Sequence, residues 1–330
     1  METVLNEPGV VSEENSYAHG DCPPGISVGT TYFRQHYLFA FATQGELLHH
    51  IRTQTLHEEM ARLEEIRSLW LAQQGTVQML AHKESGMAER CSITELPSSL
   101  SRRLNEISDH QLIRKTFQGV PFSFALVDTD RLIAAQRSIN LDYALRLQNS
   151  YKENTSLEAL VEICLSPNRD VPPIQHLEVG NNVHVFSSEN LDIRFLGAFA
   201  KTLTPEDLPF AEIGGVPAAA IIAFVGYGSS PVNVLQVGNR LVLNNGFHRV
   251  FALHSLGITK IPVLVQHISN WQLEFPGTVS GFPREYLLGS PRPVLIKDFF
   301  NESFCITLQA KQRIKTVMLQ ATANQIDIPS

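Results

Sequence analysis

The chain of 330 residues has few cysteines and no surplus of basic residues. Its cysteines are far apart and form no C-x-x-C pair; they are Cys22, Cys91, Cys164 and Cys305. This spacing excludes the usual zinc knuckle and a disulfide framework, so we expect a reducing compartment, the cytoplasm. The formal net charge of −7 at pH 7 argues against a broad nucleic-acid surface, which needs clustered Lys and Arg to replace counterions.

Long apolar segments are also missing. The longest apolar run, residues 216–225, is too short to cross a bilayer, so we expect no membrane partner. Residues 1–30 have neither the basic nor the apolar region of a signal peptide, and their polar, acidic composition predicts a disordered tail. With 43% hydrophobic and 18% charged residues, the chain has the composition of a soluble protein with a sizeable core.

An amphipathic pattern covers residues 46–73. Glutamates and arginines fill the outer faces, and apolar side chains recur every three or four positions, at Leu56, Met60, Leu63, Ile66 and Trp70. The spacing predicts one long helix whose apolar stripe packs on its own domain or, alternatively, recruits a partner or a second copy of the chain. A homodimer formed through this helix is therefore one possible assembly.

Two aspartates follow the first strand predicted for the core. Residues 120–127 are rich in β-branched and aromatic side chains, and Asp128 and Asp130 come directly after them, ahead of a largely helical pattern over 131–147. The simpler interpretation is that these carboxylates cap the helix. Alternatively, they act as metal ligands or as a general base, because strand-to-helix junctions at one sheet edge form the usual ligand cleft of an α/β domain. The glycine corner described next is expected to face this junction.

The most informative stretch covers residues 231–265. A first strand is followed by a Gly238-Asn239 turn, since both residues tolerate the positive φ that a two-residue hairpin loop requires, and then by a second strand over 240–243. From Phe247 the apolar positions switch to helical spacing until Gly257, and residues 261–265 form a buried strand. The stretch thus predicts a hairpin, a glycine corner, a short helix and an exit strand.

The glycine corner between the hairpin and the helix gathers groups that suit an anion. Gly246 precedes the helix, whose N-terminal amides and positive dipole end attract phosphate. His248 and Arg249 add an imidazole and a guanidinium in the first turn. Asn244 and Asn245 either shape the turn or contact the ligand directly. We therefore predict a phosphate-binding corner.

With this order of elements, residues 231–265 resemble the core of the ParB/sulfiredoxin superfamily, in which a strand hairpin leads into a G-x-[HR]-R corner and a helix. The matching motifs are P-V-x-V, then G-x-x-L-V-L-N-N-G-F-H-R, then I-P-V-x-V. Residues 127–147 resemble, more loosely, the strand and helix that open this fold. The resemblance implies an α+β fold in which helices flank a mixed sheet, with a large insertion between the two segments.

The resemblance also implies a ligand: a nucleoside triphosphate, ATP or CTP, with Mg²⁺, its phosphates held by Gly246, His248 and Arg249. Relatives use this pocket for CTP-gated DNA clamping, for ATP-dependent repair of oxidised peroxiredoxin or for phosphoryl transfer to an amino acid. Sulfiredoxins have a reactive cysteine where this chain has Phe247, so that reaction lacks its nucleophile here. DNA-partition relatives continue into a helix-turn-helix region, whereas this chain continues into Pro- and aromatic-rich sequence.

Four regions are expected on this basis. They are a disordered tail (1–30), a helical N-terminal region (31–118), a ParB/sulfiredoxin-like core (119–270) with an insertion at about 150–225, and a C-terminal extension packed on the core (271–330). Within the extension, residues 271–291 are irregular, and strands are expected over 294–300, 304–308 and 314–319.

Two classes of function follow. In the first, the chain is an enzyme that transfers the terminal phosphoryl group of the nucleotide to a small molecule, a protein or water. In the second, it is a non-catalytic module, nucleotide-gated or protein-binding, an alternative favoured because the sequence offers no convincing general base. DNA binding or nuclease action is a weaker third hypothesis, since the chain is acidic overall.

Overall fold

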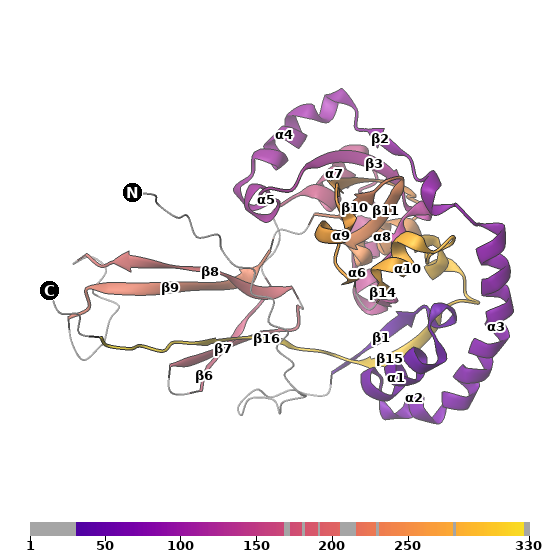
Figure 1. Ribbon diagram of the computed structural model, residues 1–330, viewed down its shortest axis with the longest axis horizontal. Coiled ribbons are helices and arrows are strands. Elements are labelled where there is room, and N and C mark those ends of the chain that lie inside the picture. The colour runs from indigo at the N-terminus through magenta and orange to yellow at the C-terminus, as the bar shows by residue number, and fades with distance from the viewer. Residues whose placement is uncertain are drawn as a thin grey trace, which may run out of the picture.

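The computed structural model describes residues 31–167, 172–179, 182–190, 192–204, 216–228, 231–279 and 282–326. These residues form a globular body and a long arm of β-strands that projects from it (Figure 1). Helices and mixed sheets are both abundant, so the chain has the α+β fold that the sequence predicts. The proposed tail, residues 1–30, lies outside the described residues. None of the helices in the described part of the chain combines the length and the apolar character that a membrane span needs.

The globular body is built on a six-stranded mixed sheet. Its strands, in spatial order, are β2 (Ile93–Glu95), β3 (Phe122–Asp128), β12 (Lys260–His267), β10 (Asn233–Val237), β11 (Arg240–Asn245) and β4 (Ile133–Ala134). β10 and β11 form the predicted hairpin, and Gly238 takes the positive φ of 56° that its turn requires. β12 returns parallel to β10, so hairpin and exit strand are neighbours.

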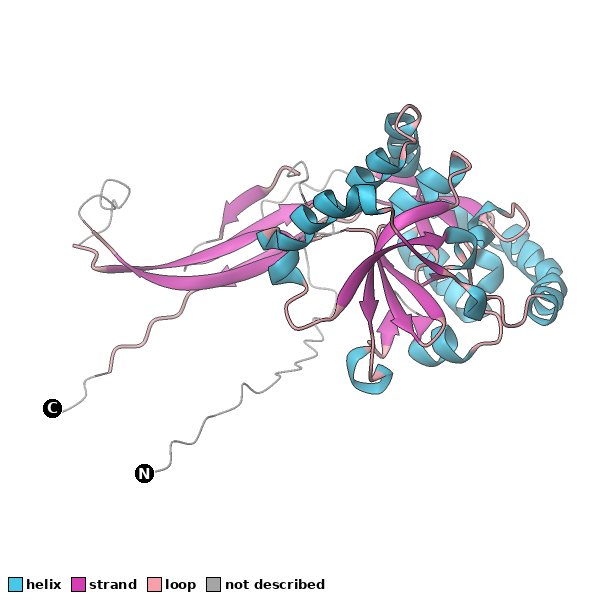
Figure 2. Cartoon of the chain, turned by 90° about the horizontal axis from the view of Figure 1, so that it is seen from above, coloured by secondary structure: helices cyan, strands magenta, loops and turns pink. Residues whose placement is uncertain are grey.

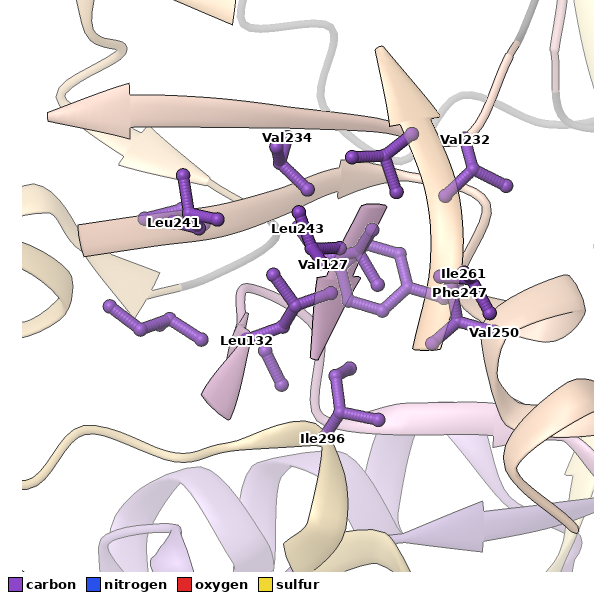
Figure 3. Close-up of a cluster of buried hydrophobic side chains, with 14 of the residues drawn as sticks. Val127, Leu132, Val232, Val234, Leu241, Leu243, Phe247, Val250, Ile261 and Ile296 are labelled. Atoms are coloured by element: carbon purple, nitrogen blue, oxygen red, sulfur yellow. The ribbon is translucent and has the colours of Figure 1, made fainter. Parts of the chain in front are cut away.

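Helices cover this sheet and close the main core. They are α4 (Ser101–Asp109), α5 (Gln111–Thr116), α6 (Leu141–Tyr151), α7 (Leu157–Leu165) and α8 (Phe247–Ser255). Figure 3 shows Phe247 and Val250 of α8 among side chains of the sheet, with Val232 and Val234 nearby. Each fully buried side chain of this size contributes about 1.5–3 kcal/mol, so packing of one apolar face fixes α8 on the hairpin that precedes it.

A second sheet and a second core lie at the other side of the body. The sheet has the order β15 (Ile306–Lys311), β1 (Tyr32–Tyr37), β5 (Ser138–Asn140). The 3-10 helix η1 (Phe39–Phe41) and the helices α1 (Gln44–Gln54), α2 (His57–Ala61) and α3 (Leu63–Lys83) follow β1. Leu47, Ile51 and Ile66 of these helices are buried against Ile306 and Leu308.

The prediction of one helix over residues 46–73 is wrong. The chain is extended at Thr55 and Leu56, where Thr55 forms a bridge with Ala310 and the amide of Leu56 donates to the carbonyl of Gln309 at 2.9 Å. This pairing with β15 interrupts the helix. The predicted stripe is nevertheless used within the chain, because Met60, Leu63, Ile66 and Trp70 belong to the second core.

Two other predicted elements differ in the structure. After Asp130 the chain forms the 3-10 helix η4 (Thr129–Arg131), β4 and β5, and α6 begins only at Leu141. Residues 132–135 are fully buried, and a short apolar run of this kind is compatible with either a helix or a strand. Here β4 pairs with β11, and this pairing makes the segment a strand. The expected strand over 294–300 is the 3-10 helix η6 (Ile296–Phe300), because the Asp298 carboxylate accepts from the amide of Leu295 at 2.7 Å.

Short elements complete the body. The irregular region 271–291 contains α9 (Trp271–Glu274), β13 (Thr278–Val279), β14 (Phe282–Pro283) and α10 (Arg284–Gly289). Two further 3-10 helices in the described residues are η2 (Ala88–Arg90) and η3 (Ser98–Leu100).

The arm consists of two small antiparallel sheets. One has the order β16 (Lys315–Gln320), β7 (Val183–Ser188), β6 (Gln175–Glu178), and the other is the hairpin of β8 (Ile193–Thr202) and β9 (Ala219–Tyr227). Both views show the hairpin extending away from the body (Figures 1 and 2). Strands β6 to β9 fall almost wholly in the region predicted as an insertion, whereas β16 is the last strand of the described chain.

Candidate phosphate-binding site

Gly246 stands at the junction of β11 and α8, and its backbone explains why it is glycine. It is the N-cap of α8 and has a φ of 97°, in the left-handed region. A Cβ here would lie 2.7 Å from Cγ2 and 3.1 Å from Cα of Val232. Since glycine has no side chain to accept from the first turn, α8 has no side-chain cap at this end.

His248 joins the first turns of two helices. Its Nε2 accepts a hydrogen bond from the amide of Asn140, the N-cap residue of α6, at 3.0 Å. Burial, assisted by the charge of Arg249, lowers the pKa of His248 to about 4. The imidazole is therefore neutral at pH 7, with its proton on Nδ1, and its first role is to hold α6 against α8 rather than to supply a positive charge.

Arg249 faces the end of a third helix. Its Nη1 donates to the carbonyl oxygens of Ile163 at 3.2 Å and Cys164 at 3.4 Å, in the last turn of α7. A guanidinium at this place offsets the partial negative charge of a helix C-terminus. Arg249 thus links α7 to α8 at the edge of the predicted corner.

The N-terminal ends of α6 and α8 form one surface. The Tyr143 amide donates to Oδ1 of its cap, Asn140, at 3.0 Å, and the Tyr143 ring meets the His248 ring edge-on at 5.2 Å. Tyr143 is 42% exposed, and the guanidinium of Arg146 lies 5.7 Å from its ring. The sequence analysis did not include Tyr143 and Arg146 in the site, because it began the helix at residue 131. Asn140, a good N-cap residue ahead of an amphipathic pattern, was the signal that α6 begins at Leu141.

The asparagines of the corner lie where β11 ends. Asn244 is exposed, and Asn245 is half-buried and pairs with Asn233 of β10. Asn233 is buried, and its Oδ1 has no hydrogen-bond partner among the described residues. The sequence analysis did not single out Asn233. Its side-chain amide stands alone within the apolar run P-V-N-V-L of a buried strand, and a buried polar group of this kind is a signal for a functional residue.

The two aspartates lie at the far end of α8. Asp128 accepts from the amide of Asp130 at 3.0 Å, and Asp130 Oδ1 contacts Nε2 of His254 at 2.7 Å. His254 is in the last turn of α8, whereas Gly246 precedes its first turn. Nine residues of helix, about 12 Å, separate the two groups. The expectation that the glycine corner and the aspartate junction face each other is therefore wrong, although both β3 and β11 end at the same edge of the sheet.

The residues at the corner fit phosphate better than they fit a metal. Two helix N-termini provide the amides and partial positive charge that a phosphate needs. Over the described ranges, no group of three or more His, Cys, Asp or Glu side chains is placed to hold a metal ion.

Comparison of the chain with family models, with curated proteins and with solved structures found no match. The fold and the geometry of the corner are therefore the basis for a functional assignment.

Proposed function

We propose that this chain is a nucleotide-binding module that holds the phosphates of a nucleoside triphosphate, ATP or CTP, at the joined N-termini of α6 and α8. One observation carries the proposal: the hydrogen bond of 3.0 Å from the Asn140 amide to His248 brings the positive ends of two helices together beside an uncapped glycine. The dipoles of two helices then act on the same anion, so a polyphosphate with several negative charges should bind more tightly than an anion with one charge.

Side chains around the two helix ends suit the rest of a nucleotide. Arg146 is exposed on the same face of α6 beside Tyr143, and its charge already reaches Asp142 in the first turn. Tyr143 offers an exposed aromatic ring beside His248, on which a base is able to stack. The Mg²⁺ expected with a nucleoside triphosphate would be held by phosphate oxygens and water rather than by a dedicated set of protein ligands.

The groups nearest the corner favour binding without turnover. Phe247 is buried in the core, so the position after Gly246 offers no nucleophile. Cys164, next to Arg249, is fully buried, and burial raises the pKa of its thiol to about 12. Asp128 and Asp130, the carboxylates considered as a base, are engaged at the other end of α8. The regulatory alternative is therefore the function that we prefer to phosphoryl transfer.

Isothermal titration calorimetry tests the proposal. We expect at least one of ATP, CTP, GTP and UTP, each with Mg²⁺, to bind with micromolar affinity and without release of inorganic phosphate. Arg146→Glu, a charge reversal on an exposed side chain, should weaken the binding about tenfold or more, because it places a negative charge beside the phosphates. The matched control is Arg102→Glu on α4, whose side chain is 93% exposed and lies in another part of the body.

Three results would contradict this function. The first is the absence of binding for all four nucleotides at millimolar concentration. The second is equal weakening by Arg146→Glu and Arg102→Glu, which would show that only the overall charge matters. The third, steady phosphate release that requires the α6 and α8 ends, would replace a binding module with an enzyme.

A further inference from the structure

The β8–β9 hairpin exposes an apolar surface that water does not favour. On one face of the hairpin, Phe199 and Phe224, whose rings stack on each other, are 50% and 48% exposed, and on the opposite face Ile221 is 81% exposed. Figures 1 and 2 show these strands standing clear of the helices of the body. A two-stranded hairpin is marginally stable in water by itself, and contiguous exposed apolar groups mark interaction surfaces. The hairpin therefore calls for a covering partner.

In the part of the chain that the structure describes, no strand lies along the outer edge of β9. Within the described residues, β9 pairs with β8 alone, whereas β8 also lies against β16. Residues 216–228 contain no charged side chain, and the strand itself contains no proline. Edge strands of soluble monomers are usually blocked by lysine, proline or a bulge, and the register shift of this hairpin is beside Leu196 on the other strand. Nothing in β9 prevents addition of another strand.

The open edge decides between a lipid and a protein as the covering partner. Along its free side, β9 presents backbone N–H and C=O groups that a bilayer interior leaves without hydrogen bonds, at a cost of several kcal/mol each. Another strand satisfies these groups directly. Residues 216–228 contain no charged side chain, so they offer no electrostatic complementarity to a charged segment of an unrelated protein.

The sequence of β9 is complementary to itself. The strand has nine residues, so antiparallel pairing of two copies about its centre places Ala223 opposite Ala223. Ile222 then faces Phe224 of the second copy, and Ile221 faces Val225. Pairs of β-branched and aromatic residues are among the favourable cross-strand pairs, and no like charges meet. Because such a contact is two-fold symmetric, it closes after two copies and does not propagate.

We propose that β9 pairs antiparallel with β9 of a second copy of this chain and forms a continuous four-stranded sheet, β8–β9–β9–β8. This pairing fills the hydrogen-bonding edge and covers Ile222 and Phe224 laterally. It places the two globular bodies at opposite ends of the shared sheet, since the tip of each hairpin lies beside the base of the other. The inference does not depend on nucleotide binding, because the corner at Gly246 is in the body.

The oligomeric state of the full chain tests the pairing, with substitutions on one rung of the hairpin. Ala198 of β8 is directly opposite Ala223 of β9, and both are exposed. We expect the parent chain and Ala198→Asp to be dimers by light scattering at micromolar concentration. Ala223→Asp should weaken dimerisation at least about 100-fold, because two carboxylates then meet at the symmetry axis. Circular dichroism should show the same folded body in all three.

A disulfide supplies a second measurement that does not rely on destabilisation. Directly opposite residues of antiparallel strands have Cα atoms about 4.5–5.5 Å apart, which a disulfide is able to span. Ala223→Cys should therefore give a covalent dimer on mild oxidation, above the level seen for the parent chain, and Ala198→Cys should not. A monomeric parent chain, equal behaviour of the two aspartate variants, or a monomer that floats with phosphatidylcholine vesicles would overturn the proposal.

Discussion

Position 246 tolerates only glycine without a loss of stability. Its φ of 97° costs any residue with a side chain about 1 kcal/mol, and the Cβ would also approach Val232 to 2.7 Å. Gly257, at the other end of α8, has a similar φ of 80°, but a Cβ there meets nothing within 4 Å. A side chain at Gly257 would therefore cause backbone strain alone, whereas a side chain at Gly246 would cause backbone strain and a steric clash with Val232.

We predict that Gly246→Ala lowers the free energy of unfolding by about 2–4 kcal/mol, and Gly257→Ala by about 1 kcal/mol. The difference arises because both variants adopt an unfavourable φ, whereas only the first must also displace Val232. Urea unfolding followed by circular dichroism measures both values. Equal losses would show that Val232 moves away without cost.

His248 connects the site to pH. Its pKa is about 4 in the folded chain and about 6.5 when unfolded, so the unfolded state binds more protons between these values. The free energy of unfolding should therefore be highest above pH 6.5 and fall as the pH drops towards 4, by up to roughly 3 kcal/mol for a shift of this size. His50, whose pKa burial also lowers to about 4, should add a second contribution of the same sign.

We expect His248→Gln to reduce this dependence, because its Oε1 is able to accept from the Asn140 amide but does not titrate. Urea unfolding at pH 7.5 and pH 5 provides the comparison. His57→Gln, at an exposed position of α2 on which the pKa of neither His50 nor His248 depends, is the control. A slope that stays the same in His248→Gln would mean that His248 is protonated without disturbing the helix junction.

Among the elements, α3 is held in place by a buried ion cluster at its C-terminal end. Arg292 is bound to Asp298 by two hydrogen bonds of 2.6 and 2.7 Å and to Glu84, just after α3, at 2.9 Å. The side chains of Arg292 and Asp298 are 1% and 3% exposed. Lys297 completes the cluster with a contact of 2.8 Å to Glu84. These charges join α3 to η6, two elements about 200 residues apart in the sequence.

We predict that Arg292→Met lowers the free energy of unfolding by about 3–5 kcal/mol, since it leaves the carboxylate of Asp298 buried without its cation. Arg114→Met breaks the Arg114–Asp109 pair on the surface, where the arginine side chain is 68% exposed, and should cost less than about 1 kcal/mol. Denaturant unfolding of both variants tests the contrast. Similar losses would show that the buried Arg292–Asp298 pair stabilises the chain no more than a surface ion pair does.

The elements also show what sequence patterns are able to predict. The hairpin, the glycine corner, α8 and β12 were predicted in order, because turn chemistry, helical periodicity and a glycine stop all agree over residues 231–265. The helix over 46–73 and the helix after Asp130 failed at positions where a distant strand decides: β15 at Thr55, and β11 at β4. Local spacing contains no information about those partners.

The candidate site shows the same division. Gly246 was predicted correctly to lie just before α8, but the partners of His248 and Arg249, at Asn140 and at the end of α7, come from segments about 100 residues away. Asp128 and Asp130 were placed at the right sheet edge, yet the sequence does not disclose that α8 stands between them and the corner. The residue types of the corner are visible in the sequence, whereas the tertiary contacts of His248 and Arg249 are visible only in the structure.

For the molecule as a whole, composition constrained the class of protein but not its shape. An ordinary hydrophobic content of 43% is compatible with a compact body, and it does not reveal that part of this content is placed on a projecting hairpin. The run over 216–225 was recognised only as too short for a membrane span. In the structure, Val216, Ile221 and Phe224 of this run are exposed, because β9 projects from the body together with β8 (Figure 1).

The strand order β15–β1–β5 has a consequence for how the chain is made. On a ribosome, β15 at Ile306–Lys311 emerges only some 270 residues after its neighbour β1. Until then, one edge of β1 has no strand beside it and the second core lacks Ile306 and Leu308. The slow step of folding is therefore expected to be the late closure of this sheet, well after the hairpin and α8 have formed from local contacts.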